Sequence, residues 1–171
     1  MRLTLQSLSN SGGQIGAGSS TGGVGDVVID TVGFDGGGSI LGQNLLDLTI
    51  RSDYTHRAGA DITSNGDFRL AVGGNFVNAS TLQAGRSLGI NASNISNLAG
   101  ASMRSGNVQL NTGGSVTNAG DLSASGNLRS LPGRCPTPAA WSAATCWWTP
   151  APWSTVPTWA APPTTPPTAV R

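Results

Sequence analysis

The sequence predicts an all-β fold, a parallel β-helix (solenoid) with about 20 residues per coil. Residues 66–126 divide into three similar segments that end in glycine: GDFRLAVGGNFVNASTLQAG, RSLGINASNISNLAGASMRSG and NVQLNTGGSVTNAGDLSASG. Within a segment, apolar residues step by two and are separated by wider gaps of Gly, Asn and Ser, which is typical of short strands joined at corners. The chain has neither Glu nor Lys, which disfavours long amphipathic helices.

Each kind of repeat position has an expected role. Apolar residues should stack inward, because a single coil cannot bury its apolar face alone. The recurring asparagine should lie at a corner, where its amide can bond to backbone or to the next asparagine in a ladder. The predicted structural positions are Phe68, Leu88, Val108 and Leu128; Leu70, Ile90 and Leu110; Asn78, Asn97 and Asn118; and the closing Gly85, Gly106 and Gly126.

Residues 86–106 carry one residue more than the segments on either side. We expect the corner after Asn97 to absorb it, with the register restored by Val108. Such local additions are usually accommodated as a bulge.

Upstream of residue 66 the repeat is less regular. Residues 1–18 have its shape, and 25–30 and 38–43 are short strand candidates around a flexible 33–39. From about residue 45 the same repeat length is expected to stack Leu48 on Phe68, Ile50 on Leu70 and Ala58 on Asn78. Six coils spaced about 4.8 Å apart would make a rod on the order of 30 Å long.

The composition changes abruptly near residue 131. All 10 prolines, all five tryptophans and both cysteines lie at or beyond Pro132. The prediction is a β-helical domain over 1–130 and a disordered tail rich in Pro, Ala, Thr and Trp over 131–171, since dense proline denies strands their donors.

The tail also has the composition that GC-rich DNA produces when it is translated in a wrong frame. Joining the third base of each codon to the first two of the next, from Leu131 onward, allows the reading AGALSNAGGLVSGNLLVDAGALVN. Most of that string depends on the choice of third bases, but LVD is forced by 146–149. We therefore interpret the tail as a frameshift product; a natural Pro-rich linker is the alternative.

Charge and hydropathy exclude several classes of partner. A net charge of +1 gives no electrostatic basis for binding nucleic acid. No stretch approaches the roughly 20 apolar residues of a membrane span, and no signal peptide is visible. Met1 starts within a repeat rather than ahead of one, so we interpret the chain as an internal slice of a longer protein.

No catalytic residue, metal or cofactor is predicted. His56, with Ser52 and Asp53 nearby, lacks a nucleophile elbow, and a surface or corner position is favoured. Asp47 and Asp67 are separated by one repeat length, so stacking could bring them close, as a paired-carboxylate hydrolase would need.

Three further motifs have simple explanations. Cys135 and Cys146 lack the partners of a zinc site; accidental codons are the favoured explanation, and a disulfide in an oxidising compartment is the alternative. Residues 22–30, GGVGDVVID, form a single defective copy of a calcium-binding nonapeptide. The sequons at Asn78, Asn91 and Asn94 arise readily from an Asn-rich repeat.

Four segments resemble the repeats of the filamentous haemagglutinin family, large bacterial exoproteins of two-partner secretion that include contact-dependent inhibition toxins. They are SLSNSGGQIGAG at 7–18, VNASTLQAG at 77–85, INASNISNLAGASMRSG at 90–106 and VTNAGDLSASGN at 116–127. The resemblance covers most of the chain between positions 7 and 127, in the form L-x-N-x-G-x-(L/I)-x-A-x-G.

The resemblance implies a right-handed β-helix and a structural shaft segment of a secreted or cell-surface adhesin that attaches to cells or surfaces. It implies two partners for the full-length protein: an outer-membrane β-barrel transporter, and a receptor on a host cell or bacterium, with a glycan among the candidates. It carries over no catalytic residue. The alternatives are the stalk of a contact-dependent growth inhibition toxin and a carbohydrate-active β-helix of the polysaccharide lyase or tailspike type.

Overall fold

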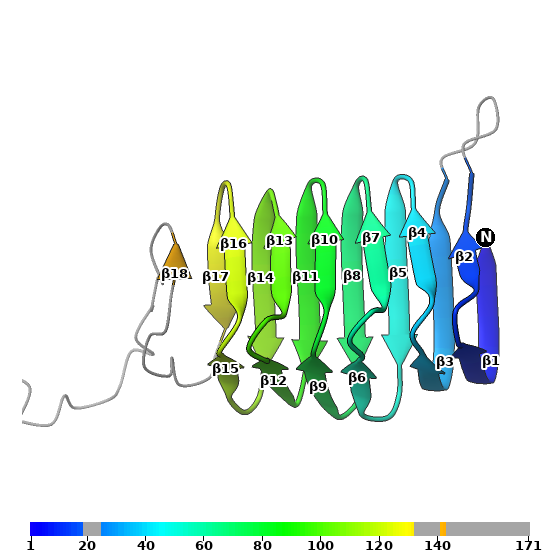
Figure 1. Cartoon of the computed structure of the whole chain (residues 1–171), viewed down its shortest axis with the longest axis horizontal. Helices are drawn as coiled ribbons and strands as arrows, with labels where there is room; N and C mark the ends of the chain where they lie inside the picture. Colours follow the sequence, from blue (N-terminus) through cyan, green and yellow to red (C-terminus); the bar gives the residue numbers. More distant parts are fainter. Residues whose placement is uncertain (19–24, 132–140, 143–171) are drawn as a thin grey trace, which may run out of the picture.

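The computed structural model describes residues 1–18, 25–131 and 141–142, and every element assigned there is a β-strand. The strands wind into a solenoid in which each coil pairs in parallel with the next (Figure 1). The predicted all-β parallel β-helix is therefore confirmed.

Three parallel sheets run along the solenoid; sheets A and B take a strand from every described coil, and sheet C takes one from only four of them. Sheet A contains β1 (Arg2–Asn10), β3 (Val27–Gly36), β5 (Leu45–Ile50), β8 (Asp67–Val72), β11 (Ser87–Ala92), β14 (Asn107–Thr112) and β17 (Leu128–Leu131). Sheet B contains β2 (Gln14–Gly16), β4 (Ser39–Gly42), β7 (Asp61–Ser64), β10 (Thr81–Ala84), β13 (Ser102–Ser105), β16 (Asp121–Ala124) and β18 (Trp141–Ser142). Sheet C contains β6 (Tyr54–His56), β9 (Asn75–Asn78), β12 (Asn94–Asn97) and β15 (Val116–Asn118).

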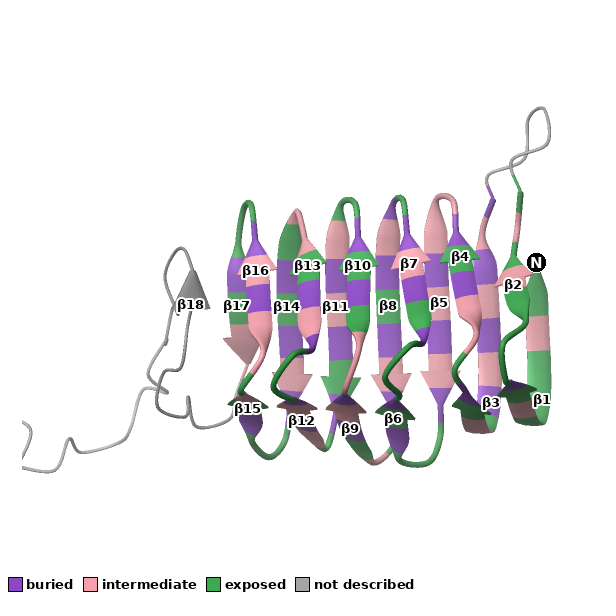
Figure 2. Ribbon diagram, viewed as in Figure 1, coloured by how far each residue is buried: buried purple, intermediate pink, exposed green. Residues whose placement is uncertain are grey.

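The core lies inside the coils, where alternate residues of the strands are buried (Figure 2). This follows from the two-residue period of a strand, which sends successive side chains to opposite faces. Two central columns in sheet A are Leu46, Phe68, Leu88, Val108 and Leu128, and Leu48, Leu70, Ile90 and Leu110. Burial of each large side chain stabilises the fold by about 1.5–3 kcal/mol, so the stabilisation is spread along the whole rod.

The predicted register of the coil that begins at β5 is wrong by two residues. Leu46, not Leu48, pairs with Phe68, and His56, not Ala58, pairs with Asn78. Along β5 and β6, a residue and its partner in the next coil are farther apart in sequence than the expected repeat length. Along β7, where Ile62 pairs with Leu82, this sequence interval returns to the expected length. The surplus lies between β6 and β7, in residues 57–60.

The additional residue in 86–106 is accommodated where the sequence predicted. Asn97 pairs with Asn78, one position short of the repeat length, while Ser102 pairs with Thr81, one position beyond it. The corner at 98–101 therefore holds two more residues than the corresponding corner of the preceding coil. Val108 pairs with Leu88, which restores the repeat length.

The first two coils differ from the later ones. β3 continues without a break to Gly36, so residues 33–36 belong to a strand and are not the flexible segment expected at 33–39. Its end covers the next coil, where the Phe34 and Tyr54 ring centroids are 5.3 Å apart. Long β1 and β3 thus replace the separate sheet A and sheet C strands of the later coils.

Little of the predicted tail falls within the described residues. Leu131 is the last residue of β17, and Trp141–Ser142 pairs in parallel with Leu122–Ser123 of β16. The predicted disorder, its frameshift origin and the two cysteines, Cys135 and Cys146, otherwise concern residues outside the described ranges.

Candidate functional surface

A column of side-chain amides runs inside the corner between sheet C and sheet B. Asn78 donates from Nδ2 to Oδ1 of Asn97 over 2.8 Å, and Asn97 donates in the same way to Asn118 over 2.7 Å. Asn78 and Asn97 are buried, at 0% and 4% exposure. An amide ladder satisfies buried polar groups that would otherwise cost about 1–3 kcal/mol each.

The same side chains also bind backbone of the following coil. Nδ2 of Asn78 donates to the Ser102 carbonyl over 3.2 Å, and Nδ2 of Asn97 donates to the Asp121 carbonyl over 3.1 Å. In the first coil, Asn10 makes the equivalent bond to the Ser39 carbonyl over 3.2 Å. Each bond ties a corner to the start of the next sheet B strand.

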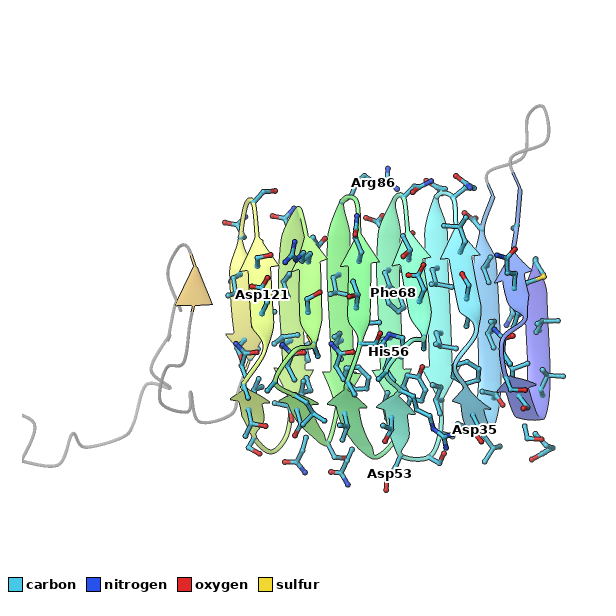
Figure 3. The ribbon with its side chains drawn as sticks, viewed as in Figure 1. Asp35, Asp53, His56, Phe68, Arg86 and Asp121 are labelled. Carbon is cyan, nitrogen blue, oxygen red and sulfur yellow. The ribbon has the colours of Figure 1, made fainter. Side chains whose placement is uncertain are left out.

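His56 occupies this corner position in the coil that begins at β5. Its Nε2 lies 3.1 Å from the Thr81 carbonyl, the equivalent of the asparagine bonds, and its Nδ1 lies 3.3 Å from the Tyr54 hydroxyl. The corner alternative in the sequence prediction is right, but the surface alternative is wrong, because His56 is 0% exposed. Figure 3 shows its ring inside the coils.

Burial lowers the pKa of His56 below its ordinary value of 6.5, against the opposing effects of the Thr81 carbonyl and of Asp61. Burial likewise raises the pKa of the Tyr54 phenol. Both side chains are therefore neutral at pH 7. A neutral His56 that donates from Nε2 to the Thr81 carbonyl can accept a hydrogen bond from the Tyr54 hydroxyl at Nδ1.

An aromatic column beneath the corner escaped the sequence prediction. Tyr54 and Phe76 stack with ring centroids 5.8 Å apart, and Phe34 covers the other side of Tyr54. The assumption of a constant repeat length placed Ala58 at the corner and left Tyr54 without a position. The available signal was the two-residue spacing of Tyr54 and His56, which is the period of a strand and matches that of Phe76 and Asn78.

The structure does not assemble the candidate catalytic groups. Ser52 donates to the Asp53 carbonyl, and His56 is engaged by Tyr54 and Thr81 instead. Asp47 pairs with Arg69, so Asp47 and Asp67 are not stacked, and that expectation is wrong. The longer interval in this coil makes them diagonal neighbours on adjacent strands instead of a directly stacked pair.

Ion pairs bridge neighbouring coils on the surface. They are Arg51–Asp30 at 2.8 Å, Arg57–Asp35 at 2.9 Å, Arg86–Asp67 at 3.2 Å and Arg104–Asp121 at 2.7 Å. The arginine side chains are about 60% exposed, so solvent screens these pairs and they add little stability. The contact with Asp30 raises the pKa of Arg51.

A second polar column follows the exposed corner between sheet A and sheet C. Asp53 Oδ1 accepts from the Asn75 backbone over 2.7 Å, Asn75 Oδ1 accepts from Asn94 Nδ2 over 2.8 Å, and Asn94 Oδ1 accepts from the Ser115 backbone over 2.9 Å. Figure 3 shows Asp53 at the outer edge of this corner. The sequence prediction did not include this column.

Shallow hollows lie beside it and on sheet A. Two open hollows of about 520 and 310 Å³ share Val72, Gly73 and Asn91, so they form one groove along the corner. Another, of about 350 Å³, lies on the outer face of sheet A between Arg69 and Arg129, where Gly89 leaves space. Amides and guanidinium groups there can donate hydrogen bonds to a polar ligand.

The remaining motifs are placed only in part. Among the sequons, Asn78 is buried in the ladder, Asn91 is exposed and Asn94 belongs to the outer column. Residues 22–24 of GGVGDVVID lie outside the described ranges, and Asp26 Oδ1 accepts from Asn44 Nδ2 over 3.0 Å. Within the described residues, no three His, Cys, Asp or Glu side chains group to hold a metal ion.

Comparison with protein-family models, with curated proteins and with solved structures finds no match. In the part of the chain that the structure describes, no helix has the length and apolar character needed to cross a membrane.

Proposed function

We propose that the chain is a shaft segment of a secreted haemagglutinin-like adhesin, right-handed in its winding, whose full-length form attaches to cells or surfaces. One observation carries the proposal: the same columns of side chains continue from coil to coil over the described solenoid. Because each coil is supported by its neighbours, such an array extends by adding coils. Stiffness and reach are the properties that a shaft supplies.

The proposal includes weak, repeated contacts along the rod rather than one deep site. The groove beside Asn91 and the hollow between Arg69 and Arg129 are shallow and lined by polar donors. Sugar hydroxyls and carboxylates suit such donors, which favours a glycan receptor on a host or bacterial surface. Export through an outer-membrane β-barrel partner is part of the same proposal and rests on the repeat resemblance alone.

The shaft proposal predicts that length scales with coil number. A tandem duplication of residues 67–106 adds two coils in register, since Asp67, Ser87 and Asn107 pair in succession. The rod should lengthen by about 10 Å at constant cross-section, measured by small-angle X-ray scattering. An unchanged length or a wider cross-section would contradict the shaft.

Attachment is tested separately. The full chain, displayed on beads, should retain beads on epithelial or bacterial cell layers, and glycosidase treatment of the cells should reduce retention. Arg69→Gln with Arg129→Gln should lower retention, while Arg57→Gln with Arg104→Gln, which changes paired arginines outside the groove and the hollow, serves as the control. Retention equal to that of uncoated beads would reject the adhesive part.

The flanking DNA distinguishes an adhesin shaft from a toxin stalk. An upstream continuation of the open frame and a downstream frame with further repeats are expected for both. A toxin domain after the repeats would assign the stalk, whereas a shifted frame full of stop codons would reject the frameshift.

A further inference from the structure

The amide column has a direction. Asn78 and Asn97 each donate to two acceptors in the following coil, as Asn97 does to Asn118 Oδ1 and to the Asp121 carbonyl. The last corner side chain in the described part of the chain is Asn118. Its Nδ2 is buried and has no hydrogen-bond partner among the described residues.

The backbone at the same place also lacks a following strand. β15 is the terminal strand of sheet C in the described residues. One coil earlier, the Ile95 N–H donates forward to the Ser115 carbonyl, and the Asn97 carbonyl accepts from the Ala119 N–H. By the same alternation, the Val116 N–H and the Asn118 carbonyl face the next coil.

The register identifies the residues that would complete this coil. β18 pairs Trp141 with Leu122, one position short of the repeat length. With the same offset, the residue that would follow Asn118 at the corner of the next coil is Thr137. It has proline on both sides. Position 138 corresponds to Ala119, whose N–H donates back to the preceding coil. A proline there has no N–H to donate.

The shifted reading frame supplies what this position lacks. We number the residues of the shifted frame from 132 onward. At positions 135 and 141 this frame encodes Leu, Met or Val, whatever third base is used. In the offset above, these two positions lie opposite the core residues Val116 and Leu122. At position 137 it encodes only Tyr, His, Asn or Asp, each with a side-chain acceptor. It also permits residues with an N–H at 136 and 138.

We propose that the edge formed by β15 and Asn118 is a docking surface for one more coil of this repeat, the coil encoded in the shifted frame, with asparagine at position 137 as the acceptor for Asn118 Nδ2. The occupant is a parallel strand that continues the established coil-to-coil interface. The proposal concerns coil stacking and does not depend on attachment to any surface.

The test replaces residues 132–149 in the full chain with AGALSNAGGLVSGNLLVD. Hydrogen exchange at the Val116 amide should slow at least about tenfold relative to the unaltered chain, because the new strand accepts from it. A control chain carries the same replacement segment in shuffled order. Equal slowing in the control, or no slowing in either chain, would overturn the proposal.

A second measurement tests the side-chain contact and keeps the result interpretable if overall stability changes. Asn118→Ala should lower the urea midpoint more in the replaced chain than in the unaltered chain. In the replaced chain, the asparagine at position 137 gives Asn118 Nδ2 an acceptor that the substitution removes. The difference should vanish when position 137 of the replacement is alanine. Equal losses in all three backgrounds would show that Asn118 does not contact the added coil.

Discussion

At the scale of single residues, the inner corner position determines how one coil is joined to the next. Asparagine fits because one amide offers a donor and an acceptor, so it can satisfy both neighbours in a column. His56 fills the position in one coil and keeps the forward bond to backbone through Nε2. The requirement is thus for a buried donor of the right reach rather than for asparagine itself.

Asn97→Ala should lower the free energy of unfolding by about 1–3 kcal/mol, because it removes the acceptor of Asn78 and the donor to Asn118 and Asp121. Urea titration followed by circular dichroism measures the change. Asn91→Ala, on the exposed face of the same coil, should change stability by less than about 0.5 kcal/mol. Equal effects from both substitutions would show that the ladder does not stabilise the fold.

His56 should make stability depend on pH. Its folded-state pKa is below the ordinary value of 6.5, so the unfolded chain binds more protons as the solution is acidified. The stabilisation is fully present above pH 6.5 and is lost as pH falls from there through the folded pKa. Urea midpoints should therefore drop between pH 7.5 and 5.

The His56→Asn variant provides the control for that pH dependence. Asparagine does not titrate and suits the ladder position, so the fall in urea midpoint over the same pH range should be smaller. Parallel curves for the two chains would assign the pH dependence to other groups.

At the scale of strands and corners, close contacts between coils dictate where glycine is required. A Cβ placed on Gly85 would collide with the backbone carbonyl of Asn65 in the preceding coil, whereas one placed on Gly89 would meet nothing within 4 Å. Gly85 lies at a corner, and Gly89 lies nearby on the outer face of β11. Alanine substitutions at these two glycines therefore form a matched pair, one with a backbone clash and one without.

Gly85→Ala should lower the melting temperature markedly, by several degrees, because a backbone carbonyl cannot move aside as a flexible side chain can. Gly89→Ala should leave it unchanged or raise it slightly, since alanine restricts the unfolded chain more than glycine does. Thermal unfolding followed by circular dichroism compares the two. A tolerated Gly85→Ala would mean that the corners relax readily.

Most strands were predictable from the sequence, although β3 extends into the segment expected to be flexible, but the register of one coil was not. Shifting a strand by two residues leaves every side chain on the same face, so Leu46 and Leu48 match Phe68 equally well by pattern. The pairings of Tyr54 with Phe76 and of His56 with Asn78 distinguish the two intervals, but His56 does not resemble the other corner residues in sequence. By contrast, the extra residue after Asn97 was located because both flanking corners carry asparagine.

For the whole molecule, stability is the sum of similar contacts between neighbouring coils. The described solenoid ends at Leu131 of β17, and beyond it only Trp141–Ser142 is described in pairing. A chain that ends at Leu131 should therefore keep a far-ultraviolet circular dichroism spectrum dominated by β-structure. Collapse of that spectrum would show that residues 132–171 are required for the fold.

The direction of the backbone hydrogen bonds has a mechanical consequence. In all three sheets they run along the rod, so a pulling force at its two ends loads many weak bonds between coils instead of the covalent chain. Each coil that detaches releases about 20 residues, or roughly 70 Å of extended chain, where about 4.8 Å of rod had been. A rod of this design lengthens stepwise under load, and each rupture between coils dissipates energy.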